Sequence, residues 1–147
     1  MIRRGTTREA RAAADLWLRA RKAALGAIPP PAHSDEEVEA WFETHVAKHL
    51  ELWVAETDSG ELHGILALDG EWIDQLYVDP AHTGRGIGSE LVELAKRRRP
   101  AGLRLWTFES NERAQRFYER HGFAAVAHTD GSENEEHWPD IQYAYLG

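Results

Sequence analysis

The sequence predicts an α/β fold in which helices flank a mixed β-sheet. Two helical segments near the N-terminus are followed by three strands that short turns separate. In the second half of the chain, strands alternate with helices. Short turns join antiparallel neighbours, whereas a helix between two strands allows them to run parallel. The order of elements therefore predicts a sheet with both kinds of pairing.

The first two predicted helices lie on either side of a proline turn. Residues 7 to about 25 are rich in Ala, Arg and Leu, and Gly26 ends this segment. Pro29-Pro30-Pro31 cannot continue a helix and predicts a stiff turn. Ser34 and Glu37 then have the spacing of a capping box, which begins a second helix. One stripe of this helix consists of Val38, Trp41, Phe42, His45 and Val46.

The predicted strands and later helices follow from changes in hydrophobic periodicity. Strands are expected at residues 52–56, 62–68 and 72–78, separated by Asp58-Ser59-Gly60 and Asp69-Gly70. A helix over 87 to about 99, a strand at 103–108 and a helix over 111–121 come next, and Gly122 ends the last of these. Two more strands are predicted at 123–127 and 141–146. The buried face of the helix at 87–99 is expected to consist of Ile87, Leu91, Leu94 and Ala95.

Length and composition are those of a globular domain with an acidic surface. The chain has 147 residues, of which 42% are hydrophobic and 29% charged. Domains of about 100–150 residues are the commonest, so we expect one domain over residues 1–147. Asp and Glu outnumber Lys and Arg by 25 to 17, which gives a net charge of −8. Nucleic acid is not expected as a partner, because binding a phosphate backbone requires a basic surface.

What the sequence lacks excludes other classes of site. Without cysteine, there can be no disulfide, thiolate metal site or cysteine nucleophile. No apolar run approaches the roughly 20 residues of a membrane helix, and no apolar segment of a signal peptide follows the basic N-terminus. His45 and His49 have the helical spacing of metal ligands, but Val46 stands where a zinc protease motif has Glu. We expect a full-length cytoplasmic protein with no metal and no membrane partner.

The most informative segment is rich in glycine and precedes a predicted helix. It consists of Thr83, Gly84, Arg85, Gly86, Ile87, Gly88 and Ser89. Glycines let successive backbone N–H groups point toward one anion, and the helix adds its positive N-terminal end. A Walker A loop would need a lysine, and the dinucleotide fingerprint would need a glycine in place of Ser89. A turn that only reverses the chain is the alternative.

Two further motifs flank the glycine-rich segment. Leu76-Tyr77-Val78-Asp79-Pro80 precedes it, and Asn111-x-x-Ala114-x-x-Phe117-Tyr118-Glu119-Arg120-x-Gly122-Phe123 follows it. Over residues 76–123 this order strongly resembles the GCN5-related N-acetyltransferase (GNAT) superfamily. The resemblance implies a GNAT-like fold, with a central mixed, mostly antiparallel sheet of six to seven strands flanked by about four helices. It also implies that two parallel strands splay apart and bind acyl-CoA there.

The activity implied by the resemblance is acetyl transfer from acetyl-CoA to a primary amine of a small molecule or peptide. The glycine-rich segment would hold the pyrophosphate, and main-chain groups of Leu76, Tyr77 and Val78 would pair with the pantetheine arm. An N–H there would stabilise the developing oxyanion, which is worth about 3 kcal/mol per donor elsewhere. Thr83 departs from the family, which usually has Arg or Gln at this position. A non-catalytic acyl-CoA-binding module is therefore the alternative.

Tyr118 matches the tyrosine that the family places next to the CoA sulfur. The resemblance implies that Tyr118 is the general acid for the leaving thiolate, because a phenol with a pKa of about 10 stays protonated at neutral pH. Simple packing beside Phe117 on an amphipathic helix is the alternative. Asn111 is expected to cap its helix, to contact the pantetheine, or to do both.

Asp74 is the candidate general base. Strand alternation predicts that Asp74, Leu76 and Val78 share one face of the strand at 72–78, together with Trp72. The other face would carry Ile73, Gln75 and Tyr77. Family members with a carboxylate base often have Glu near the start of this strand, so Asp74 is displaced from that position by one pleat. The alternatives are a polar surface contact, a water chain, or an amine that binds already neutral.

An acidic segment near the C-terminus predicts a cationic amine acceptor. Residues 130–140 contain no Lys or Arg but carry Asp130, Glu133, Glu135, Glu136 and Asp140. Such a rim would attract cations, although a solvated loop that adds solubility is the alternative. The negative net charge is compatible with an anionic donor, because main-chain N–H groups and Arg85 would hold that donor locally. A homodimer is compatible with the sequence.

Overall fold

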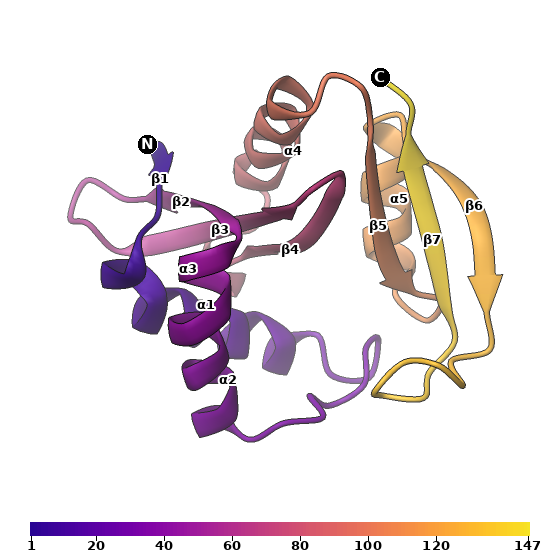
Figure 1. The fold of residues 1–147 in the computed structure, drawn as a ribbon, viewed down its shortest axis with the longest axis horizontal. Helices are drawn as coiled ribbons and strands as arrows, with labels where there is room; N and C mark the ends of the chain where they lie inside the picture. The colour runs from indigo at the N-terminus through magenta and orange to yellow at the C-terminus, as the bar shows by residue number, and fades with distance from the viewer.

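The computed structural model describes all 147 residues, and a single seven-stranded sheet runs through it (Figure 1). The strand order is β1-β2-β3-β4-β5-β7-β6. Only β4 and β5 are parallel, which confirms the predicted mixed, mostly antiparallel sheet. The strands are β1 (Ile2–Arg4), β2 (Glu51–Glu56), β3 (Leu62–Asp69), β4 (Trp72–Val78), β5 (Leu103–Phe108), β6 (Ala124–Thr129) and β7 (Asp140–Tyr145).

Four helical segments flank the sheet, as predicted. The capping box is present, since Ser34 Oγ accepts from Glu37 N at 3.2 Å and Glu37 Oε1 accepts from Ser34 N at 2.9 Å. None of the helices is long and apolar enough to cross a membrane. The segments are α1 (Ala10–Ala23) after the 3₁₀ turn η1 (Thr7–Glu9); α2 (Asp35–Trp41), which continues through the π-helical turn η2 (Phe42–Val46) into α3 (Ala47–His49); α4 (Ile87–Arg98) after the 3₁₀ turn η3 (Pro80–His82); and α5 (Glu112–Arg120).

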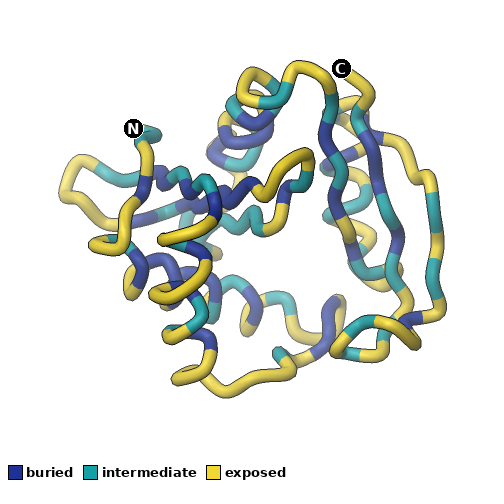
Figure 2. The backbone as a smooth tube through the Cα atoms, viewed as in Figure 1, coloured by how far each residue is buried: buried dark blue, intermediate teal, exposed yellow.

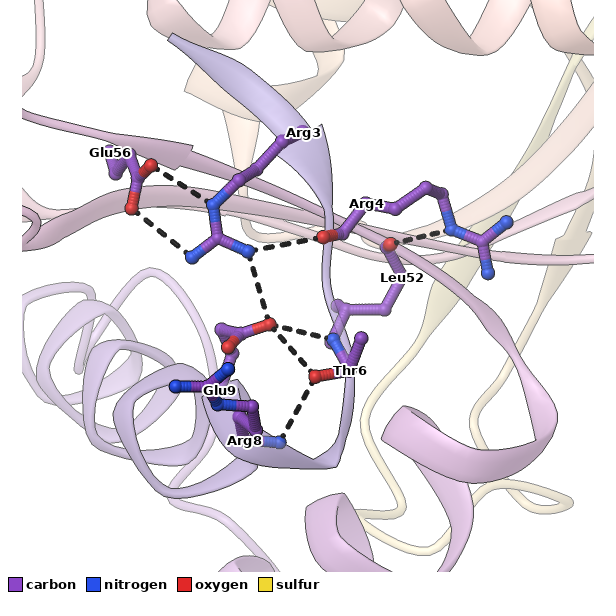
Figure 3. Close-up of polar contacts among 7 residues, drawn as sticks. All are labelled: Arg3, Arg4, Thr6, Arg8, Glu9, Leu52 and Glu56. Atoms are coloured by element: carbon purple, nitrogen blue, oxygen red, sulfur yellow. Dashed lines mark hydrogen bonds and ion pairs between the residues drawn. The ribbon is translucent and has the colours of Figure 1, made fainter.

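Strand β1 is absent from the elements that the sequence predicts, because three residues with two arginines show no hydrophobic period. Polar contacts attach it to its neighbours (Figure 3). Arg3 Nε donates to Glu56 Oε1 of β2 at 3.0 Å, and Arg3 Nη1 donates to Glu9 Oε1 at 3.2 Å. The same Glu9 oxygen accepts from Thr6 N at 2.8 Å in a second capping box. One arginine thus joins β1, β2 and the start of α1.

Two hydrophobic clusters lie on opposite faces of the sheet, because Ile65 and Ala67 of β3 belong to one and the alternate residues Leu66 and Leu68 belong to the other. Figure 2 shows the buried stretches of backbone in the strands and in the helices. Residues of α1, α2 and η2 form the first with β2 and β3, and residues of α4 and α5 form the second. The predicted helix faces differ from the observed ones at two places: His45, on the predicted stripe with Val46, is exposed, and Val92 is buried while Leu94 is partly buried against the second cluster. The π-helical turn η2 has more residues per turn than an α-helix and rotates His45 outward.

Strand β4 contains a β-bulge at Asp74. Ala67 of β3 pairs with Gln75, but Leu68 pairs with Ile73, so Asp74 is an extra residue on β4. Ile73 therefore joins the same hydrophobic cluster as Leu76. The predicted alternation is wrong at Ile73, because a bulge resets the two-residue period of the strand.

Strands β4 and β5 separate soon after they begin, as the family resemblance implied. Trp72 and Arg104 are their only paired residues, and Arg104 N donates to Glu71 O at 2.9 Å. The indole rings of Trp72 and Trp106 stack across the two strands with centroids 6.2 Å apart. Figure 1 shows β4 and β5 diverging beyond this point. The edge of β4 that faces β5 is therefore left without a strand partner.

Candidate functional site

A cavity of about 810 Å³ opens where β4 and β5 separate. Its walls come from β4, from β5, from the glycine-rich segment with α4 and α5, and from the end of α1 with the connection that follows. Among the lining residues are all the predicted site residues except Arg85, namely Asp74, Leu76, Tyr77, Val78, Thr83, Gly84, Gly86, Ile87, Gly88, Ser89, Asn111 and Tyr118.

Arg85 is not brought to this cavity. It lines a smaller pocket of about 390 Å³ together with Met1, His63 and Glu90. The flanking glycines have φ values of +80° at Gly84 and +81° at Gly86. These left-handed turns leave Arg85 on the other side of the segment, so its expected help in holding an anion inside the cavity finds no support.

The glycine-rich segment presents a row of free backbone donors at the start of α4. The N–H groups of Gly84, Arg85 and Gly86 donate no hydrogen bond within the protein. Those of the first helical turn have no carbonyl partner for geometric reasons. Gly86 is the N-cap and lies in the left-handed region, which favours glycine. Free donors beside a helix N-terminus can hold a pyrophosphate-like anion.

Tyr118 lies on α5 and is both packed and turned to the cavity. It is 8% exposed, and its ring contacts Phe117 and Phe123 with centroids 5.1 and 5.5 Å apart. Its hydroxyl makes no hydrogen bond within the protein, although Tyr118 lines the cavity. Burial raises the pKa of Tyr118, and nearby Tyr77 raises it further. The phenol therefore keeps its proton at neutral pH, with no internal partner for that proton.

Two smaller contacts order the wall around Tyr118. Asn111 caps α5, since its Oδ1 accepts from Ala114 N at 3.2 Å, and it also lines the cavity. A Cβ atom added at Gly88 would lie 3.2 Å from the Phe117 ring. The missing side chain at Gly88 thus allows α4 to approach Phe117 of α5 closely.

Asp74 supplies the only carboxylate among the lining residues. Its side chain is accessible from the cavity, and Gln75 Nε2 donates to its Oδ2 at 3.2 Å. Desolvation by the surrounding protein raises the pKa of Asp74, and the Asp69 carboxylate adds to this rise. The Gln75 hydrogen bond and His45 act in the opposite direction. A carboxylate with a raised pKa is a stronger base, which suits proton abstraction.

Much of the cavity wall was not predicted from the sequence. Leu25 and Ile28, from the connection after α1, and Trp106 and Phe108 of β5 are large apolar residues that line the cavity. Trp106 is 46% exposed although it lies on an inner strand. The sequence contained no signal for this exposure, because it depends on the separation of β4 from β5.

The acidic segment at residues 130–140 does not reach the cavity, since none of its carboxylates lines it. Glu135 Oε2 lies 2.9 Å from His33 Nε2 and raises the pKa of that histidine. Asp130 Oδ1 accepts from Ser132 N at 2.9 Å. These contacts support the alternative in which the acidic segment is a solvated loop, and not the one in which it forms a rim that attracts the acceptor.

The histidines with metal-ligand spacing lie on η2 and α3. The rings of His45 and His49 are 5.9 Å apart, and His45 stacks on Trp41 at 6.4 Å. No group of three or more His, Cys, Asp or Glu side chains in the chain could hold a metal ion.

Comparisons with known proteins agree with this geometry. Residues 48–125, more than half of the chain, match the acetyltransferase (GNAT) domain family. Peptidyl-lysine N-acetyltransferase YjaB of Salmonella typhimurium is 37% identical over 94 residues, which are 64% of this chain and 64% of that protein. The match thus spans less than two thirds of the relative's length.

Solved structures share the fold over the full chain. The solution structure of apo-form YjaB from Escherichia coli has a TM-score of 0.80 and 28% identity, and the match covers 100% of this chain and 97% of that one. The PaiA N-acetyltransferase of Thermoplasma acidophilum, solved in complex with coenzyme A, has a TM-score of 0.70 at 18% identity and covers 100% and 98%. Fold and family match together show that the chain belongs to the acetyltransferase (GNAT) domain family.

Proposed function

We propose that the protein is an N-acetyltransferase that transfers an acetyl group from acetyl-CoA to a primary amine, with a peptide lysine as the acceptor class. The observation that carries this proposal is the cavity between β4 and β5, which joins free backbone donors, an unpartnered phenol and one carboxylate. Family membership supports the reaction class. Relatives named peptidyl-lysine N-acetyltransferases support the acceptor class.

Acetyl-CoA would be held largely by the main chain. The N–H groups of the glycine-rich segment and of the first turn of α4 would bind the pyrophosphate. The unpaired edge of β4 would pair with the pantetheine arm as a further strand would. An N–H of this edge, at Leu76 to Val78, would stabilise the charge that develops on the thioester oxygen.

Two side chains would transfer protons: Asp74 at the acceptor nitrogen and Tyr118 at the leaving sulfur. Asp74 accepts the protons that the acceptor nitrogen loses and passes them to solvent, while nitrogen bonds to the carbonyl carbon. As the carbon–sulfur bond breaks, Tyr118 donates its proton to the leaving sulfur and regains one from solvent. The raised pKa of each group fits its role, because Asp74 becomes a stronger base and Tyr118 stays protonated.

The acceptor end of the cavity suits a long aliphatic amine. Leu25, Ile28 and Trp106 would contact the methylene groups of a lysine side chain. Asp74, the only lining carboxylate, would receive its ammonium group. A cationic acceptor thus remains part of the proposal, with Asp74 in place of the acidic segment as the attracting group.

The proposal is tested by titrating acetyl-CoA into the protein and then measuring thiol release with three acceptors. These are a lysine peptide blocked at its N-terminus, the same peptide with a free N-terminus and acetylated lysine, and a small diamine. We expect acetyl-CoA binding, with the fastest thiol release from the first peptide. Binding without release from any amine would favour the non-catalytic module, and absence of binding would exclude both functions.

Replacing Gly86 by alanine should weaken acetyl-CoA binding by about tenfold, or ~1.4 kcal/mol. Alanine disfavours a φ of +81°, so the backbone donors around residue 86 would turn away from the pyrophosphate. The matched control is Gly60→Ala, which has a φ of +88° in a hairpin turn and, like Gly86, open space around an added Cβ. Both variants should lose stability, but equal CoA affinity in the two would argue against this anion site. Calorimetric titration measures the difference.

Three expectations from the sequence remain predictions: one domain over residues 1–147, a cytoplasmic location, and the compatibility with a homodimer. Size measurements in solution and localisation of the tagged protein would test them. The transfer reaction requires none of the three.

A further inference from the structure

Helix α1 makes a polar contact with β4 behind the cavity wall. The indole Nε1 of Trp17 donates to Gln75 Oε1 at 2.8 Å. Trp17 is 7% exposed, and its ring packs edge-on against Trp41, Phe42 and Tyr77 with centroids 6.0 to 6.4 Å apart. Because aromatic rings surround the indole, the position and direction of this donor are set by the core.

The direction of the Gln75 amide follows from this donor. An indole N–H can only donate, so Gln75 must present its oxygen to Trp17 and its NH₂ group to the other side. There, Gln75 Nε2 donates to Asp74 Oδ2 at 3.2 Å. The two hydrogen bonds form a series in which a buried donor on α1 determines which end of the amide faces the carboxylate.

Asp74 has no other internal partner. It makes no ion pair, and its Oδ1 accepts no hydrogen bond within the protein. The bulge places it outside the regular pairing of β4 with β3. The titratable groups that shift its pKa are Asp69, which raises it, and His45, which lowers it. Gln75 is therefore the only side chain that fixes the carboxylate, and it leaves Oδ1 free for a substrate proton.

We propose that Trp17 and Gln75 are positioning residues that hold Asp74 for proton abstraction, a role that rests on the proposed function. Without the Trp17 donor, Gln75 Oε1 has no partner and nothing holds the amide in place, so the side chain is free to turn away from Asp74. Asp74 would then lose its only fixed partner and, with it, its orientation toward the cavity.

Breaking either of the two hydrogen bonds, from Trp17 to Gln75 or from Gln75 to Asp74, should change the pH dependence of the reaction in a predictable direction. The Gln75 hydrogen bond lowers the pKa of Asp74, so removing this bond raises that pKa further. The acid limb of the kcat/KM profile should then move to higher pH. The bond is made to an ionised carboxylate, so its loss corresponds to about a tenfold to hundredfold fall in kcat/KM on that acid limb.

The test compares Trp17→Phe, which keeps an aromatic ring but removes the donor, with Gln75→Leu and with the double variant. The matched control is Trp53→Phe, because Trp53 Nε1 donates to Glu51 Oε2 at the same 2.8 Å but does not line the cavity. We expect similar losses in both single variants, no further loss in the double variant, and an unchanged profile in the control. In an Asp74→Asn background, Trp17→Phe should have no further effect.

Two results would overturn the proposal. One is a fall in kcat/KM in the double variant equal to the product of the two single falls, and the other is a fall caused by Trp17→Phe that persists in the Asp74→Asn background. Gln75 is only partly buried, so Gln75→Leu still decides the question if Trp17→Phe fails to fold.

A second readout needs no activity. Carbon-13 NMR titration of the Asp74 carboxyl in the substrate-free protein should show a higher pKa in both variants than in the wild type and Trp53→Phe. An unchanged pKa would count against the positioning role. Absence of thiol release from the wild-type protein would instead contradict the proposed function and leave the NMR comparison to decide the inference.

Discussion

Replacing Tyr118 by phenylalanine is expected to lower kcat by about 10²- to 10⁴-fold, the usual contribution of a general acid. The affinity for acetyl-CoA should hardly change, because only the hydroxyl is lost and the ring keeps its contacts with Phe117 and Phe123. Without the phenol, the thiolate must leave unprotonated or take a proton from water. Thiol release at saturating acetyl-CoA measures kcat, and calorimetry measures the affinity.

Tyr143→Phe is the matched control for Tyr118. Tyr143 is also a buried tyrosine, but its hydroxyl donates to Glu119 Oε2 at 2.9 Å and it does not line the cavity. Desolvation and Glu119 raise its pKa to about 12, so both phenols are protonated at neutral pH. The control should lose some stability and keep its kcat. Equal kcat values in wild type and Tyr118→Phe would remove Tyr118 as the acid.

Replacing Asp74 by asparagine should lower kcat/KM at neutral pH by about 10²- to 10⁴-fold. Asp74 is active when ionised, so wild-type activity rises as the pH rises through its pKa, which desolvation places above the ordinary range. This acid limb should disappear in Asp74→Asn. The rate should then recover only at a pH where the acceptor amine is neutral in solution. A pH–rate profile with lysine peptide as acceptor measures both effects.

The same substitution should not destabilise the fold. A raised pKa means that the folded state binds the Asp74 proton more tightly than the unfolded state does. Folding stability therefore decreases as the pH rises from the unfolded pKa, about 3.9, through the folded pKa. Asp74→Asn removes this cost, so its melting temperature at pH 7 should equal or exceed that of the wild type.

Asp58→Asn, at an exposed hairpin turn, is the control for both measurements. It should change neither the acid limb nor the rate. An Asp74→Asn protein that retains the wild-type acid limb would show that a water chain or a neutral amine replaces the carboxylate base.

The secondary structure was largely predictable because its signals are local. The capping box of Ser34 and Glu37 begins α2, and the bounds of β4 and β5 agree with the predicted ranges. Hydrogen bonds of caps and the periodicity of strands depend on residues a few positions apart. The short strand β1 has no such period, and only its pairing with β2 makes it a strand.

The parts of the candidate site that depend on local signals were also predictable. The glycine-rich segment was recognisable because Gly84 and Gly86 adopt positive φ angles, and Tyr118 was recognisable because its motif is contiguous in the sequence. The direction of Arg85 depends on the turns on either side of it, and the faces of β4 depend on a bulge that is visible only in its register with β3. Periodicity alone therefore misplaced Ile73, and the position of Arg85 in the glycine-rich segment did not show which side of that segment it would occupy.

The sequence by itself determined the family, the glycine-rich segment at the start of α4 and the position of Tyr118 on α5, because these depend on neighbouring residues. Only the tertiary structure decided what surrounds Asp74: the bulge, the Gln75 amide and the Trp17 indole, 58 residues from Gln75. It also decided that the acidic segment lies away from the cavity and contacts His33. Contacts between distant residues follow from the packing of helices on a twisted, partly opened sheet, and no local pattern encodes their direction.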